Sequence, residues 1–352
     1  DAQALVEKFI PAPSEEDKSR ALKAAFDLFA SFGITSVQDA RFDPEDLPTF
    51  ERVIREGGLK VRIYAALPLE KNPSPELLER YKKLREAHRG PLLKFGAVKG
   101  FVDGVVEAKT AAMLEPYVGG GSGHLNWTPE ELNSTVTIYD REGYQILLHA
   151  IGDRAIRVAL DAYQEAARKN GPLPRRHRIE HVEVPQPADV QRFKLLGVIA
   201  STQAFFANPD KDTLETYSEN LGKEREAHAM PFRLLDDSGA VQAFGSDWPV
   251  YSCDVLKGIY AAVTRQTPEG NPPGGWHPEQ RISTEAAVRH FTRDAAYASF
   301  DEGQKGTILP GALADFVVLS ENILEGPPET HLKAQVLLTV LAGQDTYRAR
   351  GF

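Results

Sequence analysis

The sequence predicts an α/β fold, a (β/α)8-type barrel that is one strand short, with a small β appendage at its C-terminal end. Three observations predict this class. Strand and helix patterns alternate over residues 1–300, which is typical of a parallel sheet. No Gly-x-Gly-x-x-Gly loop follows an early strand, so a doubly wound nucleotide-binding sheet fits less well. Polar residues recur where the predicted strands end, as they do at the mouth of a barrel.

The composition is that of a globular chain. Its 352 residues, 42% of them hydrophobic, can bury a sizeable core. The net charge of −9 argues against a nucleic-acid surface, which needs clustered Lys and Arg. A single cysteine, Cys253, excludes an intramolecular disulfide framework and a cysteine-based zinc site. No run approaches the roughly 20 apolar residues of a membrane span.

The predicted elements follow one another in regular order. Ser14 with three acids behind it predicts a helix start, and Gly33 predicts the end of that helix. Apolar residues at helical spacing predict further helices at residues 75–88, 130–143, 155–169, 188–196 and 283–298. Short apolar runs predict seven strands, at residues 34–39, 61–67, 93–103, 145–149, 176–182, 198–203 and 241–247.

Two segments depart from this alternation. Residues 104–127 form a long loop rich in glycine, and a loop of that length in a compact domain predicts a functional lid, shaped by residues 119–123 and Trp127. After residue 300, short β runs with Gly and Pro turns predict a small β appendage packed on the barrel. We therefore expect two domains, the barrel over residues 1–300 and the appendage over residues 301–352.

Four predicted strands end in a side chain able to bind a cation: Lys99 or Asp103, His149, His181 and Asp247. Residues two apart on a strand share a face, so Phe95 and Ala97 are expected to lie below Lys99 on one face. Two imidazoles and a carboxylate at one mouth suit zinc or a similar divalent ion. Asp247 could also take a proton from water that the ion activates.

Each of these residues also has a simpler structural interpretation. A single histidine at a strand end is more often a hydrogen-bonded structural residue than a ligand, and we interpret His177 and the remaining histidines in that way. Asp103 and Asp153 could cap the helices that follow them. An ammonium repels a metal ion, so Lys99 must be neutral, paired with a carboxylate or modified. The agreement of three strand ends favours the metal site.

Five motifs resemble the metal-dependent amidohydrolase superfamily and, within it, the YtcJ-like group of the amidohydrolase 3 family. They are residues 98–104 with 110–117 (VKGFVDG and TAAMLEPY), 148–155 (LHAIGDRA), 177–181 (HRIEH), 244–249 (FGSDWP) and 311–319 (GALADFVVL). The resemblance implies a TIM-barrel hydrolase with a small β-sandwich, of which residues 301–352 are the C-terminal part. It further implies cleavage of a non-peptide carbon–nitrogen bond in an amide, formamide or cyclic amide.

The resemblance also implies roles for the residues at the strand ends. Lys99 would be a carboxylated lysine whose carbamate bridges two metal ions, and His149 and His181 would be metal ligands. Asp247 would be both a ligand and the general base. One or two divalent ions are implied, and we expect zinc.

The polar residues close to these positions are expected to contact the substrate, which is a small molecule. They are Asp103, Asp153 and Gln203.

The chain departs from the superfamily in one respect. The superfamily carries a His-x-His pair at the end of its first barrel strand, and no such pair occurs here. One absent N-terminal segment would account for the missing pair, the missing strand and the missing half of the β-sandwich. We therefore interpret the chain as the C-terminal part of a longer enzyme. An N-terminal segment or a second copy of the chain would be its partner. We expect a cytoplasmic protein, and a signal peptide would lie in the upstream segment.

Two rival functions stay open at this point. The absent His-x-His pair favours a catalytically silent barrel that acts as a binding scaffold. The same metal ligands would also suit a metal-dependent isomerase or decarboxylase.

Overall fold

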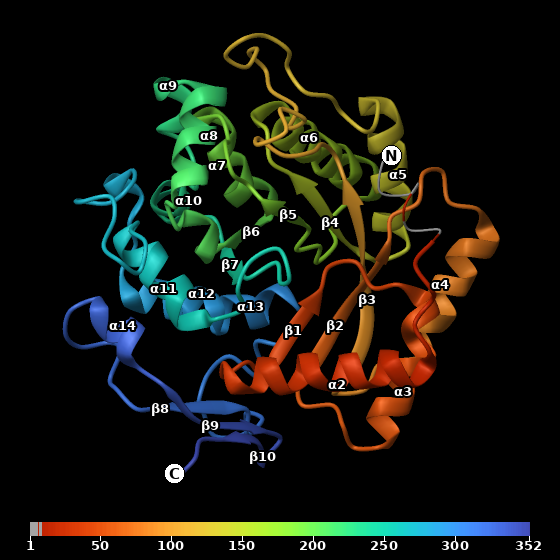
Figure 1. The fold of residues 1–352 in the computed structure, drawn as a ribbon. Helices are drawn as coiled ribbons and strands as arrows, with labels where there is room; N and C mark the ends of the chain where they lie inside the picture. The colour runs from red at the N-terminus through yellow and green to blue at the C-terminus, as the bar shows by residue number, and fades with distance from the viewer. Residues whose placement is uncertain (1–5, 7–8) are drawn as a thin grey trace.

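The computed structural model describes Val6 and residues 9–352. Its main element is a sheet of seven parallel strands in sequential order, and a second sheet holds three antiparallel strands (Figure 1). The large sheet contains β1 (Ser36–Asp39), β2 (Arg62–Pro68), β3 (Leu93–Phe101), β4 (Gln145–Ala150), β5 (Arg178–His181), β6 (Ile199–Gln203) and β7 (Gln242–Gly245). The small sheet contains β8 (Phe316–Leu319), β9 (Val336–Leu341) and β10 (Gln344–Arg348).

The strands of the large sheet curl into a half-barrel, so the predicted α/β barrel class is confirmed. All seven predicted strands are present within a few residues of their expected bounds. Within the described residues, β1 pairs only with β2, and β7 pairs only with β6. As far as the structure describes the chain, the half-barrel therefore has two free edges.

Helices lie outside the curled sheet, and the main hydrophobic core fills the space between them and the strands (Figure 1). The helices that contribute to this core are α2 (Glu15–Ser31), α3 (Leu47–Arg55), α4 (Pro75–Ala87), α5 (Pro129–Arg141), α6 (Asp153–Asn170), α7 (Pro187–Leu196) and α10 (Phe232–Ser238). The others are α8 (Lys211–Leu221), α9 (Lys223–Glu226), α11 (Val255–Thr264), α12 (Thr284–Phe291), α13 (Arg293–Ala298) and α14 (Glu329–Lys333).

The start and end of α2 lie where the sequence predicts them. The Ser14 hydroxyl accepts a hydrogen bond from the Asp17 backbone N–H at 3.1 Å, and the Asp17 carboxylate accepts one from the Ser14 N–H, which is a capping box. At the other end, Gly33 has a φ of +79°, and a Cβ there would lie 2.8 Å from Val317. Glycine is therefore required both by the backbone and by the small sheet packed against it.

The helices differ from the sequence-based prediction in two respects. The helix expected over residues 283–298 is two helices, α12 and α13, because the backbone turns at Thr292 (φ −118°, ψ −87°). Helices α3, α8, α9, α10, α11 and α14 were not predicted. Helix α11 buries nearly its whole middle, including Ile259, Tyr260 and Ala261, so it lacks the polar face by which an amphipathic helix is recognised.

The predicted shared face of Phe95, Ala97 and Lys99 is wrong for Phe95. The register between β2 and β3 shifts at Gly96, because Ala65 pairs with Phe95 while Ala66 pairs with Ala97. The extra residue turns Phe95 outward, where its ring lies 5.1 Å from that of Phe42 in the main core. Such a bulge reverses the alternation of side chains along a strand.

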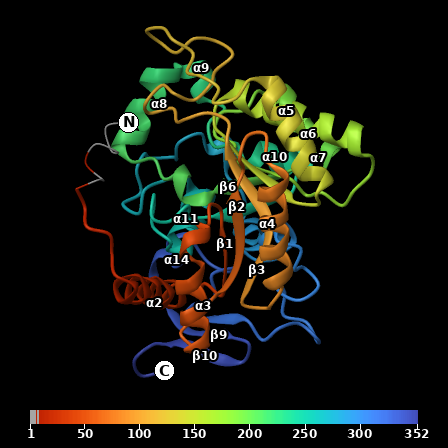
Figure 2. The same cartoon turned by 90° about the vertical axis from the view of Figure 1, so that its right-hand side faces the viewer.

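The small sheet packs beneath α2 and the start of the large sheet (Figure 2). Thr339 on β9 donates a hydrogen bond to the carbonyl of Ala30 at 2.7 Å. Arg62 on β2 donates to both carboxylate oxygens of Asp315, at 2.6 and 2.9 Å, and both side chains are buried. A domain boundary at residue 300 stays a prediction.

Among the described residues, no helix is both long and apolar enough to cross a membrane.

Candidate active site

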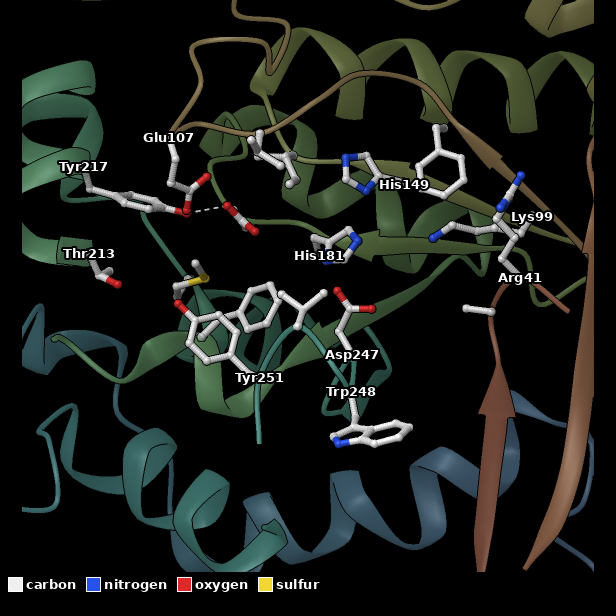
Figure 3. A pocket seen from close by; sticks show the side chains of 18 of the residues that line it. Arg41, Lys99, Glu107, His149, His181, Thr213, Tyr217, Asp247, Trp248 and Tyr251 are labelled. Atoms are coloured by element: carbon white, nitrogen blue, oxygen red, sulfur yellow. Dashed lines mark hydrogen bonds between the residues drawn. The ribbon is translucent and has the colours of Figure 1, made fainter. Parts of the chain in front are cut away.

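A cavity of about 660 Å³ lies at the carboxyl ends of the strands (Figure 3). Its volume is in the range of small-molecule sites. Residues that follow β1, β3, β4, β5 and β7 reach its wall, so the curled sheet supports most of its circumference. Figure 3 shows two groups of polar side chains in it, one around Lys99, His149, His181 and Asp247, and another around Glu107 and Tyr217.

His149 at the end of β4 and His181 at the end of β5 form the centre of the first group. Their ring centroids lie 4.5 Å apart. Nε2 of His149 donates to the carbonyl of Gly104 at 2.9 Å, and Nδ1 of His181 donates to Oε1 of Gln203, also at 2.9 Å. The second nitrogen of each ring makes no hydrogen bond to any described residue. Each ring is thus held through one nitrogen and leaves the other free, which is how metal-binding histidines are oriented.

Both histidines are neutral at physiological pH. Burial lowers the pKa of His149 to about 4, and Lys99 lowers it further against the hydrogen bond to Gly104. Burial also places the pKa of His181 well below its usual value. Neutral imidazole is the form that binds a metal.

Lys99 projects into the same end of the cavity from β3 (Figure 3). Burial lowers the pKa of its ammonium to about 8, although the Glu180 carboxylate acts in the opposite direction. Its Nζ donates no hydrogen bond to a residue that the structure describes, and lies 5.2 Å from the ring centre of Phe101. A substantial neutral fraction of Lys99 therefore exists near pH 8.

Asp247 follows β7 and faces the cavity from an exposed position. Desolvation raises the pKa of its carboxyl, and the charge of Lys99 opposes that shift. The backbone at Asp247 has a φ of +55°, and that at His181 has a φ of +80°. Such left-handed conformations are unfavourable for these residues and often occur at functional sites.

The chemistry of this group fits a divalent metal in part. Two neutral imidazoles each present a free ring nitrogen. Among the described residues, however, no three His, Cys, Asp or Glu side chains are grouped closely enough to hold an ion as they stand. Lys99 or Asp247 would have to complete the coordination.

The three predicted substrate contacts lie behind the cavity wall. Asp103 accepts hydrogen bonds from the backbone N–H groups of Ala112, Ile151 and Gly152, while burial raises its pKa to about 7. It thereby fixes the turn that follows His149. Direct contact of Asp103 with a substrate stays a prediction.

The side chains of Asp153 and Gln203 also form hydrogen bonds within the protein. Asp153 accepts from the backbone of Leu114 and from the side chain of Gln186. Gln203 orients His181. Both residues hold the site in shape, and substrate contact by either one stays a prediction.

His177 and Trp127 lie away from the cavity. His177 is buried between the backbone N–H of Ile146 and the carboxylate of Asp140, as its structural interpretation requires. Trp127 is buried in the main core, where its Nε1 donates to the carbonyl of Phe101 at 2.8 Å. In the long glycine loop, Glu107 reaches the cavity wall, whereas residues 119–123 do not.

The second group of polar side chains was not identified from the sequence. Glu183 is buried at the cavity wall, and its Oε2 accepts a hydrogen bond from the hydroxyl of Tyr217 on α8. Burial and the charge of Glu107 raise the pKa of Glu183 to about 8. The one feature of the sequence that could have identified Glu183 was its position two residues after His181.

Asp39 at the end of β1 also lines the cavity, and burial raises the pKa of its carboxyl.

A curled parallel sheet with its polar residues gathered at the carboxyl ends of the strands is the arrangement of α/β-barrel proteins. Comparison with known proteins gives the family. The model of the amidohydrolase family matches residues 1–347. The chain belongs to this family.

Two relatives show how much of the chain is shared. The protein LONG AFTER FAR-RED 3 of Arabidopsis thaliana is 36% identical over 258 residues, which cover 72% of this chain and 43% of that protein. The putative amidohydrolase YtcJ of Bacillus subtilis is 28% identical over 98% of this chain and 64% of its own length. The chain thus spans about half the length of the curated relatives that it matches.

Solved structures agree with the fold. An uncharacterised metal-dependent hydrolase from Pyrococcus furiosus superposes with a TM-score of 0.74 at 26% identity, over 92% of this chain and 64% of that one. An uncharacterised metal-dependent hydrolase from Pyrococcus horikoshii has the same fold, with a TM-score of 0.76 at 24% identity, over 93% of this chain and 64% of that one.

Proposed function

We propose that the protein is a divalent-metal-dependent hydrolase that cleaves the carbon–nitrogen bond of an amide, formamide or cyclic amide in a small molecule. The observation that carries the proposal is the arrangement of His149 and His181, two neutral imidazoles that are each held through one nitrogen and lie side by side with the other nitrogen free. Lys99 and Asp247 line the same end of the cavity.

His149, His181 and Lys99 would hold the ion, with Asp247 as a further ligand. When bound, a divalent ion supplies Lewis-acid activation of water and of the substrate carbonyl near neutral pH. We expect zinc, since two imidazoles with oxygen ligands suit it.

Lys99 fits this role as a carbamate. A neutral amine reacts with carbon dioxide to give a carbamate anion and a proton, which turns a repelling ammonium into a negatively charged oxygen ligand. The lowered pKa of Lys99 supplies the neutral amine that this reaction needs. No described residue donates or accepts a hydrogen bond at its Nζ, so the nitrogen is available.

Asp247 would move the proton during hydrolysis. Its carboxylate takes a proton from the attacking water as the water oxygen bonds to the carbonyl carbon, and returns it to the nitrogen as the carbon–nitrogen bond breaks. The products are an acid and an amine. A carboxylate with a raised pKa suits both steps, because it must hold the proton and then release it.

The relatives support this substrate class. One of them is named an N-substituted formamide deformylase, from Arthrobacter pascens, and is 26% identical over 74% of this chain and 47% of its own length.

Metal analysis by plasma mass spectrometry on the purified protein tests the proposal, together with the intact mass of the same sample. We expect one or two equivalents of zinc, which the double variant His149→Ala, His181→Ala loses. His124→Ala is the matched control, because His124 is exposed and lies away from the cavity wall. A protein that stays free of metal after zinc is added would overturn the proposal and favour a binding scaffold.

Product analysis distinguishes the remaining rival. Incubation of the zinc-loaded protein with a panel of formamides and cyclic amides should release amine and acid in equal amounts. A product with the mass of the substrate, or loss of carbon dioxide, would instead identify an isomerase or a decarboxylase.

The proposal extends to location and assembly. A cytoplasmic location is proposed because the single cysteine forms no intramolecular disulfide, the kind of bond that oxidising compartments favour. The free edges of β1 and β7 favour pairing with a strand of another segment or a second copy. Cell fractionation and sedimentation equilibrium test these two points.

A further inference from the structure

We propose that the cavity end formed by Glu107, Glu183 and Tyr217 binds an ammonium group of the substrate. The substrate would then be an amide of a diamine or of another amine with a second, cationic nitrogen. This inference rests on the proposed hydrolase function, because it assigns the amide carbon to the end of the cavity that holds His149 and His181.

The main evidence is the environment of Glu183. This residue is only 3% exposed, yet it lines the cavity. The hydroxyl of Tyr217 donates to Oε2. Oε1 accepts no hydrogen bond and meets no cationic side chain within the described part of the chain, and it is not among the fully enclosed polar atoms that lack a partner. A buried carboxylate therefore presents an open oxygen to the cavity.

Glu107 adds a second carboxylate to the same end. It lines the cavity from the long loop after β3 and, like Glu183, forms no ion pair with a residue of the described ranges. Figure 3 shows Glu107 and Tyr217 pointing toward each other, far from Lys99 and Arg41. Lys99 and Arg41 are the Lys and Arg residues that line the cavity within the described part of the chain, so no described cation neutralises this end.

A carboxylate that is taken out of water without a cation is unfavourable, which is why burial raises the pKa of Glu183. A bound ammonium group would stabilise the carboxylate form of Glu183, and its proton would leave to water. An ammonium group would donate one hydrogen bond to the open oxygen of Glu183 and another to Glu107. It would also lie against the ring of Tyr217 or Tyr251, and aromatic faces attract cations. The chemistry of this end thus selects positive charge.

An aromatic wall connects the two ends of the cavity. The ring of Phe206 is stacked on that of His181, with centroids 6.0 Å apart and planes 12° apart. The ring of Tyr251 lies 4.8 Å from that of Phe206, and Tyr251 lies on the side of Glu107 and Tyr217 (Figure 3). An alkyl chain could pack along this wall, so the structure suits an apolar spacer between the amide and the ammonium group.

Matched pairs of substrates test the inference. The probes are N-formyl-α,ω-diaminoalkanes with spacers of increasing length, each compared with the neutral formamide in which a methyl group replaces the ammonium. With the zinc-loaded protein, we expect kcat/KM for the cationic member to be at least about tenfold higher at the best spacer length. That ratio corresponds to one hydrogen bond to a charged group.

Glu183→Gln should reduce this ratio to near one, since the amide keeps the size and the contact with Tyr217 but removes the charge. Tyr217→Phe should lower the ratio in the same direction and provides a second variant if the first fails to fold. Glu224→Gln is the matched control. It removes one negative charge from an exposed position on α9 outside the cavity, and should leave the ratio unchanged.

Equal kcat/KM for the two members of every pair would overturn the inference, as would a preference for an analogue ending in a carboxylate or an unchanged ratio in Glu183→Gln. Failure of the proposed function has a different result, namely no hydrolysis of either member. In that case calorimetric titration with free 1,4-diaminobutane decides. Binding that Glu183→Gln weakens at least about tenfold supports the ammonium site, and absence of binding to the parent protein overturns it.

Discussion

Replacing Gln203 with leucine removes the acceptor that fixes the ring of His181. Nδ1 of His181 donates to Oε1 of Gln203 at 2.9 Å, and both side chains are buried. Loss of one buried hydrogen bond costs about 1–3 kcal/mol, and each 1.4 kcal/mol is about tenfold in a binding constant. We therefore expect Gln203→Leu to weaken zinc binding about 10- to 100-fold, the usual range for a residue that orients a metal ligand.

Competition with a chromophoric chelator measures this affinity directly. The control is Gln203→Glu, which keeps an acceptor oxygen opposite Nδ1 of His181 and should retain most of the affinity. Circular dichroism and the thermal midpoint show whether each variant is folded. A folded Gln203→Leu protein that binds zinc as tightly as the parent would refute the assignment of His181 as a ligand oriented by Gln203.

Three further predictions follow from other contacts. Arg62→Met should lower the free energy of unfolding by about 3–5 kcal/mol, because it leaves the buried carboxylate of Asp315 without its partner; guanidinium denaturation measures this, and a loss below about 1 kcal/mol would contradict it. Burial lowers the pKa of His290, but hydrogen bonds to two aspartates outweigh burial and raise it. Protonated His290 therefore stabilises the folded state fully at pH values below its unfolded pKa of about 6.5. This stabilisation declines as the pH rises through the pKa of His290 in the folded protein. Denaturation at pH 6 and pH 8 should show this decline in the parent protein and less of it in His290→Gln. Lys99→Met should abolish any gain in zinc content on adding bicarbonate, and an equal gain in the variant would exclude a carbamate on Lys99.

The sequence was sufficient for the order of the strands and for the first group of site residues. Parallel strands of one sheet place their carboxyl ends at one edge, so polar residues at those ends converge without any knowledge of side-chain packing. His149, His181 and Asp247 were predicted in this way, and all three line one cavity. Lys99 lines it as well, although the argument from side-chain alternation failed lower in its strand.

Other features depended on contacts between residues far apart in the chain. The bulge at Gly96 arises from the register between β2 and β3, which no local pattern shows. Helix α11 is buried on several sides by its neighbours and therefore has no polar face in its sequence. Hydrophobic periodicity in the sequence identifies an element that has one buried and one exposed face. It therefore detects neither the bulge at Gly96 nor the helix α11.

The sequence by itself determined that strands alternate with helices and that histidines, a lysine and a carboxylate stand at the strand ends. Only the tertiary structure decided what surrounds them. It paired His181 with Gln203 of the next strand, buried Lys99 so that its pKa falls, and enclosed Glu183 with Tyr217 of α8 at the far end of the cavity. The physical reason is that desolvation and hydrogen-bond partners depend on the complete set of neighbours, which residue order does not specify.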